Sequence, residues 1–304
     1  RQRTTTPMGL YKKQRTLAAP VSFSGHGVHS GKTVNLTVHP APPNYGVRFR
    51  RMDLPAKPTV AGHFNRVVDT SLATVIGESG CIVSTIEHLM ATLAGLSVDN
   101  ALVEIDDYEL PIMDGSAAVF TRQIREKGIQ SQDAPRFYFI IEKPIRIEGQ
   151  DKSVCVYPDS RRLITCTIDF DHPAIGRQTY EIELSDERFE AEISGARTFG
   201  FLHELEMMKF YGLARGGSLE NSVGVDENGV VNAEGLRWPD EFVRHKILDC
   251  IGDFSLLGLP ILGHITLYKS GHNFNHAFLK TFFKQKKSWK TATIDMMDTV
   301  GIAR

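Results

Sequence analysis

The residues best suited to chemistry in this sequence lie in the segment 238–254. His245, Asp249 and Asp253 follow one another at intervals of four residues, which places them on one stripe of an α-helix. Apolar residues recur on a second stripe, and this pattern predicts a half-buried helix that begins near Asp240. An imidazole and a carboxylate one turn apart can bind the same metal ion. The alternative is a solvated ion pair, which is the commoner meaning of H-x-x-x-D by itself.

The segment 84–91 contains a candidate for a third metal ligand, His88. His88 directly follows Glu87, and a glutamate beside a metal-ligating histidine is a common source of the base that takes a proton from bound water. Glu87 also stands three residues after Ser84, which is the spacing of a helix capping box. The sequence supports catalysis and capping equally, and the two roles are compatible.

His272 is the fourth candidate for chemistry. It follows Gly271 between a predicted strand and a predicted helix, where an imidazole is well placed for acid–base work, although most histidines in such loops are polar surface. Two further segments, 196–201 and 216–218, are predicted to be loops. The glycine pair in the second matches neither a P-loop nor a dinucleotide fingerprint, so no phosphate site is assigned to it.

Two similar sets of strands and helices must position these residues. The first half is predicted to contain strands at 34–38, 46–50 and 100–105 and helices at 84–93 and 116–127. The second half is predicted to contain strands at 137–141, 153–157 and 163–170 and helices near 203–211, 240–257 and 273–287. The polar stretch 130–135 is interpreted as the boundary between two α+β domains, residues 1–132 and 133–304.

Composition excludes several classes of protein. The 304 residues include 35 Lys and Arg against 36 Asp and Glu, which argues against nucleic acid as the main partner. No apolar run reaches the roughly 20 residues of a membrane-spanning helix. The four cysteines form no C-x-x-C pair, so we expect buried free thiols and a cytoplasmic protein. Residues 1–9 lack the apolar core of a signal peptide and are expected to be flexible or an artificial lead-in.

Five segments in colinear order resemble the UDP-3-O-acyl-N-acetylglucosamine deacetylase family, namely 85–89, 111–116, 194–201, 241–253 and 269–272. This family carries out the committed step of lipid A biosynthesis in Gram-negative bacteria. The resemblance extends over about 15–289 and implies two β-α-α-β domains whose helix layers face each other, with the active site between them. It also implies that an insert in the second domain forms a hydrophobic passage for a fatty acyl chain.

The resemblance implies a chemical role for each matching residue. The ligands of a zinc ion, or of ferrous iron in the cell, would be His88, His245 and Asp249. Glu87 would be the general base for a water molecule. His272, oriented by Asp253, would be the general acid that protonates the leaving amine, and Thr198 would help to stabilise the oxyanion.

The substrate implied by the resemblance is UDP-3-O-acyl-N-acetylglucosamine, and a monomer is expected. The substrate-contacting positions would be Lys246, Phe199, Leu202, Leu205, Ala214 and Ser218. Two places depart from better-known members, Ala73 and the Arg-Gly-Gly stretch at 215–217. Because both bear on the acyl passage and the site entrance, the resemblance leaves the preferred chain length open.

Two other functions fit some of the same residues. A set of two histidines and one carboxylate also suits a non-haem iron oxygenase, although such sites normally lie in β-barrels and this His–Asp pair lies on a long helix. A nucleotide-sugar or lipid-binding module without enzymatic activity would need no metal. Metal analysis combined with a deacetylation assay separates these possibilities.

Overall fold

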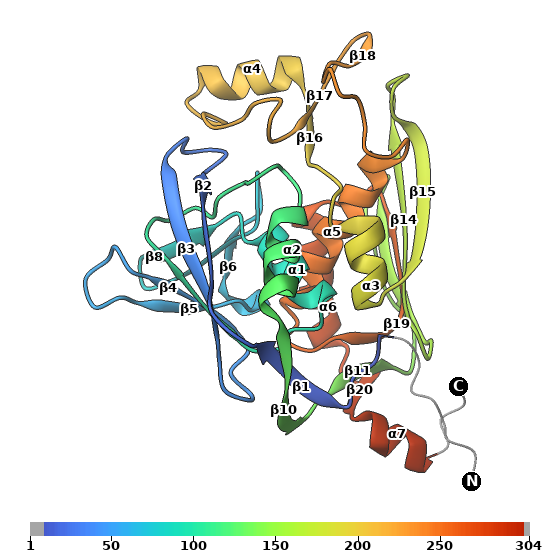
Figure 1. Ribbon diagram of the computed structural model, residues 1–304. Helices are drawn as coiled ribbons and strands as arrows, with labels where there is room; N and C mark the ends of the chain where they lie inside the picture. Colours follow the sequence, from blue (N-terminus) through green and yellow to red (C-terminus); the bar gives the residue numbers. More distant parts are fainter. Residues whose placement is uncertain (1–8, 301–304) are drawn as a thin grey trace.

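The structure, a computed structural model, describes residues 9–300 (Figure 1). Helices from both halves of the chain lie in the middle of the molecule, with one sheet on the left of Figure 1 and another on the right. This arrangement confirms the predicted α+β class. Residues 1–8, which belong to the predicted lead-in at 1–9, lie outside the described residues.

The main sheet of the first half has five strands. They are β2 (Val21–His26), β3 (Thr33–Pro40), β4 (Val47–Arg51), β5 (Thr59–Ala61) and β9 (Ala101–Ile105). Their order is β2-β3-β9-β4-β5, and only β4 and β9 run parallel. In β3 the alternate residues Val34, Leu36 and Val38 are buried, because successive side chains of a strand point to opposite faces.

A smaller sheet of the first half leads into the site. Its three antiparallel strands are β6 (Val67–Asp69), β7 (Val75–Glu78) and β8 (Cys81–Ser84). The chain then enters helix α1 (Glu87–Gly95), three residues later than the predicted start at residue 84. Helix α2 (Ala118–Lys127) follows and ends at Gly128, as predicted.

The main sheet of the second half has seven strands. They are β11 (Tyr138–Ile141), β12 (Ile145–Glu148), β13 (Ser153–Tyr157), β14 (Arg162–Phe170), β15 (Gly176–Glu183), β19 (Ile261–Tyr268) and β20 (Trp289–Ala292). Strand β19 runs parallel to β11 and β14 and antiparallel to β13. The predicted alternation in β14 is observed, since Ile164, Cys166 and Ile168 are buried.

Helices α5 (Glu241–Ser255) and α6 (His272–Lys284) of the second half complete the central layer, and α5 packs against α1. A glycine permits the closest approach of these two helices. A Cβ atom at Gly252 would lie 2.2 Å from the carbonyl oxygen of Glu87, so only a residue without a side chain fits there. Shorter helices are α3 (Asp186–Arg188), the π-helix Phe189–Ile193, which packs against α5, the 3-10 helix Phe64–Arg66 and α7 (Ile294–Val300).

A separate small unit interrupts the second half and lies at the top of Figure 1. It consists of β16 (Phe199–Phe201), α4 (Leu202–Phe210), β17 (Val223–Asp226) and β18 (Gly229–Val230). The prediction of a loop over 196–201 was therefore partly wrong. Strand β16 exists because it pairs in parallel with β17, and three residues are too short to show a period of two in the sequence.

The predicted boundary segment 130–135 is not a linker. It forms strand β10 (Ile129–Pro135), which pairs antiparallel with β1 (Lys13–Leu17) near the other end of that half. Strand β10 is polar because most of its side chains remain partly or fully exposed. The division into residues 1–132 and 133–304 stays a prediction.

All four cysteines are free and buried, as predicted. Their burial in the core explains why they need no disulfide partner or metal. Over residues 9–300, every helix is too short or too polar to cross a membrane.

Candidate metal centre and active site

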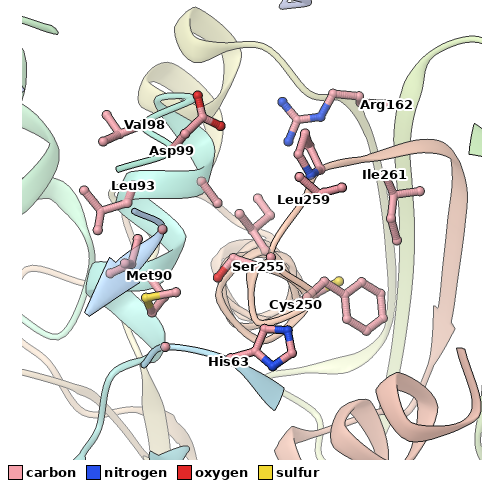
Figure 2. A pocket seen from close by; sticks show the side chains of 18 of the residues that line it. His63, Met90, Leu93, Val98, Asp99, Arg162, Cys250, Ser255, Leu259 and Ile261 are labelled. Carbon is pink, nitrogen blue, oxygen red and sulfur yellow. The ribbon is translucent and has the colours of Figure 1, made fainter. Parts of the chain in front are cut away.

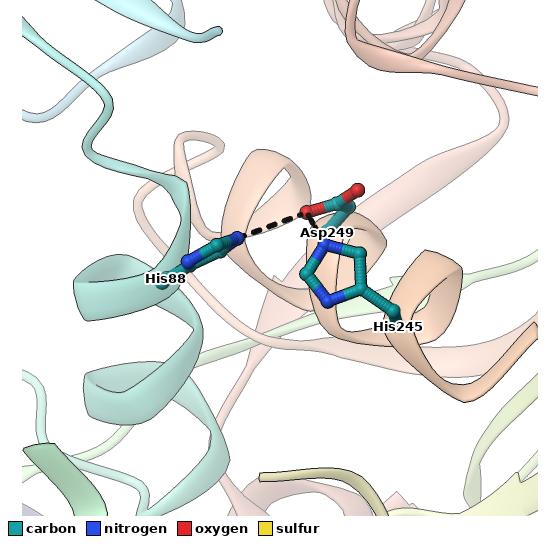
Figure 3. Close-up of side chains that lie close together, drawn as sticks. All are labelled: His88, His245 and Asp249. Carbon is teal, nitrogen blue, oxygen red and sulfur yellow. Dashed lines mark ion pairs between the residues drawn. The ribbon is translucent and has the colours of Figure 1, made fainter. Parts of the chain in front are cut away.

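Two helices from different halves of the chain bring His88, His245 and Asp249 together (Figure 3). His88 lies in the first turn of α1, while His245 and Asp249 lie one turn apart on α5. The Nε2 atom of His88 is 3.6 Å from Oδ1 of Asp249, and Nε2 of His245 is 3.4 Å from the same oxygen. All three side chains are buried, so the interpretation of His245 and Asp249 as a solvated ion pair is wrong.

The polar atoms of this cluster fit a bound cation. Oδ1 of Asp249 is buried and accepts no hydrogen bond from the described residues, and such an oxygen is unfavourable without a positive partner. Nδ1 of His245 is 2.9 Å from the carbonyl oxygen of Ala196. Since a carbonyl only accepts, Nδ1 carries the proton and Nε2 keeps its lone pair for a metal.

The protonation states of the cluster favour a metal as well. Burial lowers the pKa of His245 to about 4, which keeps the imidazole neutral. Burial acts to raise the pKa of Asp249, but nearby positive groups, among them His272 and Lys246, outweigh it and hold that pKa well below its usual range. A neutral imidazole and an ionised carboxylate are the forms that bind zinc.

Glu87 lies beside the cluster and does not cap its helix. Residue Ile86 occupies the cap position of α1 without a side-chain hydrogen bond, so the capping-box interpretation of Ser84 and Glu87 is wrong. The backbone keeps Ser84 from the cap position, because β8 runs to Ser84 and Thr85 then adopts a positive φ of 61° before the helix begins. The Glu87 carboxylate instead accepts a hydrogen bond from the Thr74 backbone N–H at 3.2 Å.

His272 faces Glu87 from the first residue of α6. Its Nε2 is 3.5 Å from Oε1 of Glu87, and its Nδ1 is 2.7 Å from Oδ2 of Asp253. Burial alone would lower the pKa of His272, but the charges of Asp253, Glu87 and Asp249 outweigh it and raise that pKa to about 10. Burial raises the pKa of Glu87 above its usual value. A proton acceptor and a protonated imidazole therefore stand side by side.

Two residues of this network escaped the sequence analysis. Thr74 donates its hydroxyl to Oδ1 of Asp253 at 2.7 Å, and Asn275 donates its amide to Oδ2 at 3.0 Å. Asn275 lies one helical turn after His272, a spacing that could have indicated it. Thr74 directly follows Ala73, which the family resemblance places near the site entrance, but only the tertiary fold shows its hydrogen bond to Asp253.

A cavity of about 220 Å³ contains the reactive groups and is lined by both halves of the chain. The predicted residues that line it are Glu87, His88, Thr198, Phe199, Leu205, Ala214, His245, Asp249 and His272. Unpredicted apolar residues add to its wall, namely Val28, Leu72, Ile112, Phe201 and Met208.

The remaining predicted residues lie outside the cavity lining. Asp253 stands behind His272. The ammonium nitrogen of Lys246 lies 5.9 Å from the ring centroid of Phe199. Leu202 begins α4, and Ser218 is exposed in the loop that follows, where its hydroxyl accepts a hydrogen bond from the backbone of Glu220.

The chain is similar to one family of known proteins over most of its length. The family model for UDP-3-O-acyl N-acetylglycosamine deacetylase matches residues 14–284. A protein of Myxococcus xanthus named UDP-3-O-acyl-N-acetylglucosamine deacetylase is 51% identical over 267 residues, which are 88% of this chain and 85% of the relative. Proteins of the same name from Syntrophus aciditrophicus and Teredinibacter turnerae are 44% and 43% identical; the matches cover 92% and 96% of this chain and 89% and 97% of those relatives.

Proposed function

The chain belongs to the UDP-3-O-acyl N-acetylglycosamine deacetylase family, and from this premise we propose that it hydrolyses the acetamide of UDP-3-O-acyl-N-acetylglucosamine, which yields acetate and a free amine. One observation carries the proposal. A buried His-His-Asp cluster shares a cavity with a glutamate and a histidine that can accept and donate a proton. Amide hydrolysis needs this combination, because water must be activated and the amine must leave protonated.

We propose zinc as the resident metal, held by His88, His245 and Asp249, with ferrous iron as the alternative in the cell. When bound there, the metal would lower the pKa of a water molecule and polarise the acetyl carbonyl. The unpartnered Oδ1 of Asp249 supports a cation at this position. The Nδ1–H of His245 is held by the carbonyl of Ala196, which fixes its ring with Nε2 turned toward Asp249.

Glu87 and His272 divide the proton transfers in this proposal. The Glu87 carboxylate takes a proton from the attacking water, since it lies within the cavity and its burial raises its pKa above the usual glutamate value. Nε2 of His272 gives a proton to the leaving nitrogen. Asp253 holds Nδ1 of His272 at 2.7 Å and so keeps the ring oriented and charged.

The substrate contacts follow from the lining of the cavity. Thr198 would stabilise the oxyanion of the attacked carbonyl. Phe199 lines the cavity and has Lys246 over its ring, an arrangement suited to the sugar and its phosphates. Leu205 and Ala214 would contact the acyl chain, and Leu202 and Ser218 are proposed to act at its outer end.

The biological setting is proposed with the reaction. The product amine would feed lipid A biosynthesis in a Gram-negative bacterium, and the enzyme would work in the cytoplasm as a monomer. These statements rest on the family to which the chain belongs and on the sequence, with its near-neutral charge and its buried free cysteines.

Metal analysis and a deacetylation assay on one preparation test the proposal. We expect about one zinc or iron per chain and release of acetate from UDP-3-O-acyl-N-acetylglucosamine. Loss of activity with a chelator and its return with zinc would support metal dependence. Oxygen consumption by the iron-loaded protein would favour the oxygenase alternative. A protein that binds the substrate without releasing acetate in any metal-loaded form would refute the proposed reaction.

A further inference from the structure

A second and larger cavity lies between helices α1 and α5 (Figure 2). Its volume is about 340 Å³, and it shares no lining residue with the cavity of the candidate active site. It is lined by Met90 and Leu93 from the later turns of α1 and by Phe254 from the end of α5, together with residues of β14 and β19. Its volume is within the range of small-molecule sites, which begins at about 300 Å³.

One charged side chain of this cavity has no partner. Arg162, the first residue of β14, is only 9% exposed. Its guanidinium makes no hydrogen bond or ion pair with the described residues, and Nη1 is fully buried. Figure 2 shows the guanidinium beside Leu259 at the edge of the cavity. Burial, together with the positive charge of Arg136, lowers the pKa of Arg162 to about 10, so it remains charged at neutral pH.

The neighbouring Arg136 has the hydrogen-bond partners that Arg162 lacks among the described residues. Arg136 also lines the cavity, but its Nε donates to Asp99 at 2.9 Å and its Nη1 donates to the Tyr138 hydroxyl at 3.0 Å. Among the described lining residues Asp99 alone carries a carboxylate, and its second oxygen already accepts the backbone N–H of Arg15 at 2.8 Å. A buried cation normally has a counter-charge. The described residues supply none for Arg162, so an anion that enters the cavity can take this place.

Much of the rest of the wall is apolar, although Ser255 and residues of the first half, namely Tyr45, Arg48, His63, Asn65 and Arg66, add polar groups to it. Besides the α1 and α5 residues, it includes Val98, Leu163, Ile164, Leu259, Ile261 and Ile265. A guanidinium binds a carboxylate through two parallel hydrogen bonds. An apolar wall contributes free energy for each methylene that it covers. The combination suits a molecule with a carboxylate at one end and an aliphatic chain at the other.

We propose that this cavity binds a medium-chain aliphatic carboxylic acid, with its carboxylate on Arg162 and its chain between α1 and the sheet of the second half. The volume equals that of about eleven water molecules at ~30 Å³ each. Since a methylene group is about as large as a water molecule, a chain of about ten carbons fits. The site is separate from the proposed deacetylase reaction and does not depend on it.

Calorimetric titration of the full chain with decanoate, kept below its micellar concentration, tests this proposal. Decanol has the same chain without the charge, and butyrate has the charge with a short chain; we expect both to bind at least about tenfold more weakly than decanoate. Arg162→Met keeps the length of the side chain and removes its charge. It should lower decanoate affinity at least about tenfold and leave decanol affinity unchanged or higher.

Variants separate this cavity from the active site. Leu205→Ala alters the candidate active-site cavity and should leave decanoate affinity unchanged. Leu259→Trp should fill the second cavity and abolish binding, and it provides the test if Arg162→Met does not fold. Absence of decanoate binding by the parent would overturn the proposal. So would loss of affinity in Leu205→Ala, or parental affinity in folded Arg162→Met and in Leu259→Trp.

Discussion

Among single residues, Asp249 has the surroundings that most clearly require a cation. Its buried Oδ1 lies 3.4 Å and 3.6 Å from two imidazole nitrogens and accepts no hydrogen bond from the described residues. We predict that Asp249→Ala loses bound metal and deacetylase activity together. The protein should stay folded, because His245 remains neutral when buried. Metal content, activity and thermal unfolding measure these effects.

A matched control for this prediction is Asp169→Ala, since Asp169 lies exposed on β14. It should keep both metal and activity. One equivalent of metal and full activity in Asp249→Ala would remove Asp249 from the ligand set.

Glu87 allows a test that is free of any effect on helix capping, because Ile86 holds the cap position without a side-chain bond. Glu87→Gln keeps the size of the side chain and can still accept the hydrogen bond of the Thr74 backbone N–H. It cannot take a proton from water, so we predict that kcat falls roughly 10²–10⁴-fold. Metal content and melting temperature should stay near those of the parent.

The parent-like metal content is the internal control of this experiment. If Glu87→Gln is nearly as active as the parent, the role of base passes to another group, with His272 as the nearest candidate at 3.5 Å.

The pKa values of Glu87 and His272 predict a bell-shaped dependence of kcat/KM on pH. The acidic limb belongs to a base that must be ionised, and burial of Glu87 moves this limb above the usual glutamate value of 4.5. The alkaline limb belongs to an acid that must be protonated, and it should lie toward the His272 pKa of about 10. Initial rates over a pH series measure both limbs.

Asp253→Asn tests the assignment of the alkaline limb. It removes the carboxylate that contributes most to raising the pKa of His272, so this limb should move to lower pH.

The folded-state pKa of His272 lies above its usual value of 6.5. The protonated His272 imidazole therefore contributes its full stabilisation of the fold below about pH 6.5, and this stabilisation is lost as the pH rises through about 10. An unchanged rate and alkaline limb in His272→Ala would make His272 a bystander.

At the scale of elements, the contact between α1 and α5 sets the position of Glu87 and His88. Gly252 permits this contact, since a Cβ there would lie 2.2 Å from the Glu87 carbonyl oxygen. We predict that Gly252→Ala destabilises the protein by about 1–3 kcal/mol. Displacement of the α1 N-terminus should also lower kcat on the order of 10²-fold. Chemical denaturation and steady-state kinetics measure the two effects.

Ser255→Ala serves as the control on the same helix. Its hydroxyl only donates to the Gly252 carbonyl within α5, so its loss should leave kcat unchanged. Parental stability and kcat in Gly252→Ala would show that the helices can separate without disturbing the site.

At the scale of the whole molecule, the candidate active site is closed by the unit that contains β16 and α4. Leu205 and Met208 of α4 line the cavity and have no polar role there. Each methylene that a ligand buries contributes up to about 0.8 kcal/mol. We therefore predict that removal of the whole acyl chain lowers kcat/KM by several orders of magnitude. Competition between the acylated substrate and plain UDP-N-acetylglucosamine measures the difference.

Two leucines of α4 provide a matched pair for this prediction. Leu205 lines the cavity and Leu202 does not, so Leu205→Ala should lower kcat/KM for the acylated substrate more than Leu202→Ala does. Equal turnover of the two substrates by the parent would exclude an acyl passage.

The sequence by itself determined the elements and the local pairs of the site. Long segments with a clear period, such as α5 and β14, were predicted within a few residues, because burial of one face imposes that period. The four-residue interval placed His245 and Asp249 on one helical face. The colinear motifs also identified the family, which the comparisons confirm over residues 14–284.

Only the tertiary structure decided which residues these pairs meet. It joined His88 to His245 and Asp249 through the contact of α1 with α5, and it brought the hydroxyl of Thr74 to Asp253. It also turned the polar segment 130–135 into β10, because β1 pairs with it from more than a hundred residues away. The spacing of apolar residues along a helix or strand indicates which face of that element is buried. The partner of that face is fixed by contacts between distant segments, and these leave no period in the sequence.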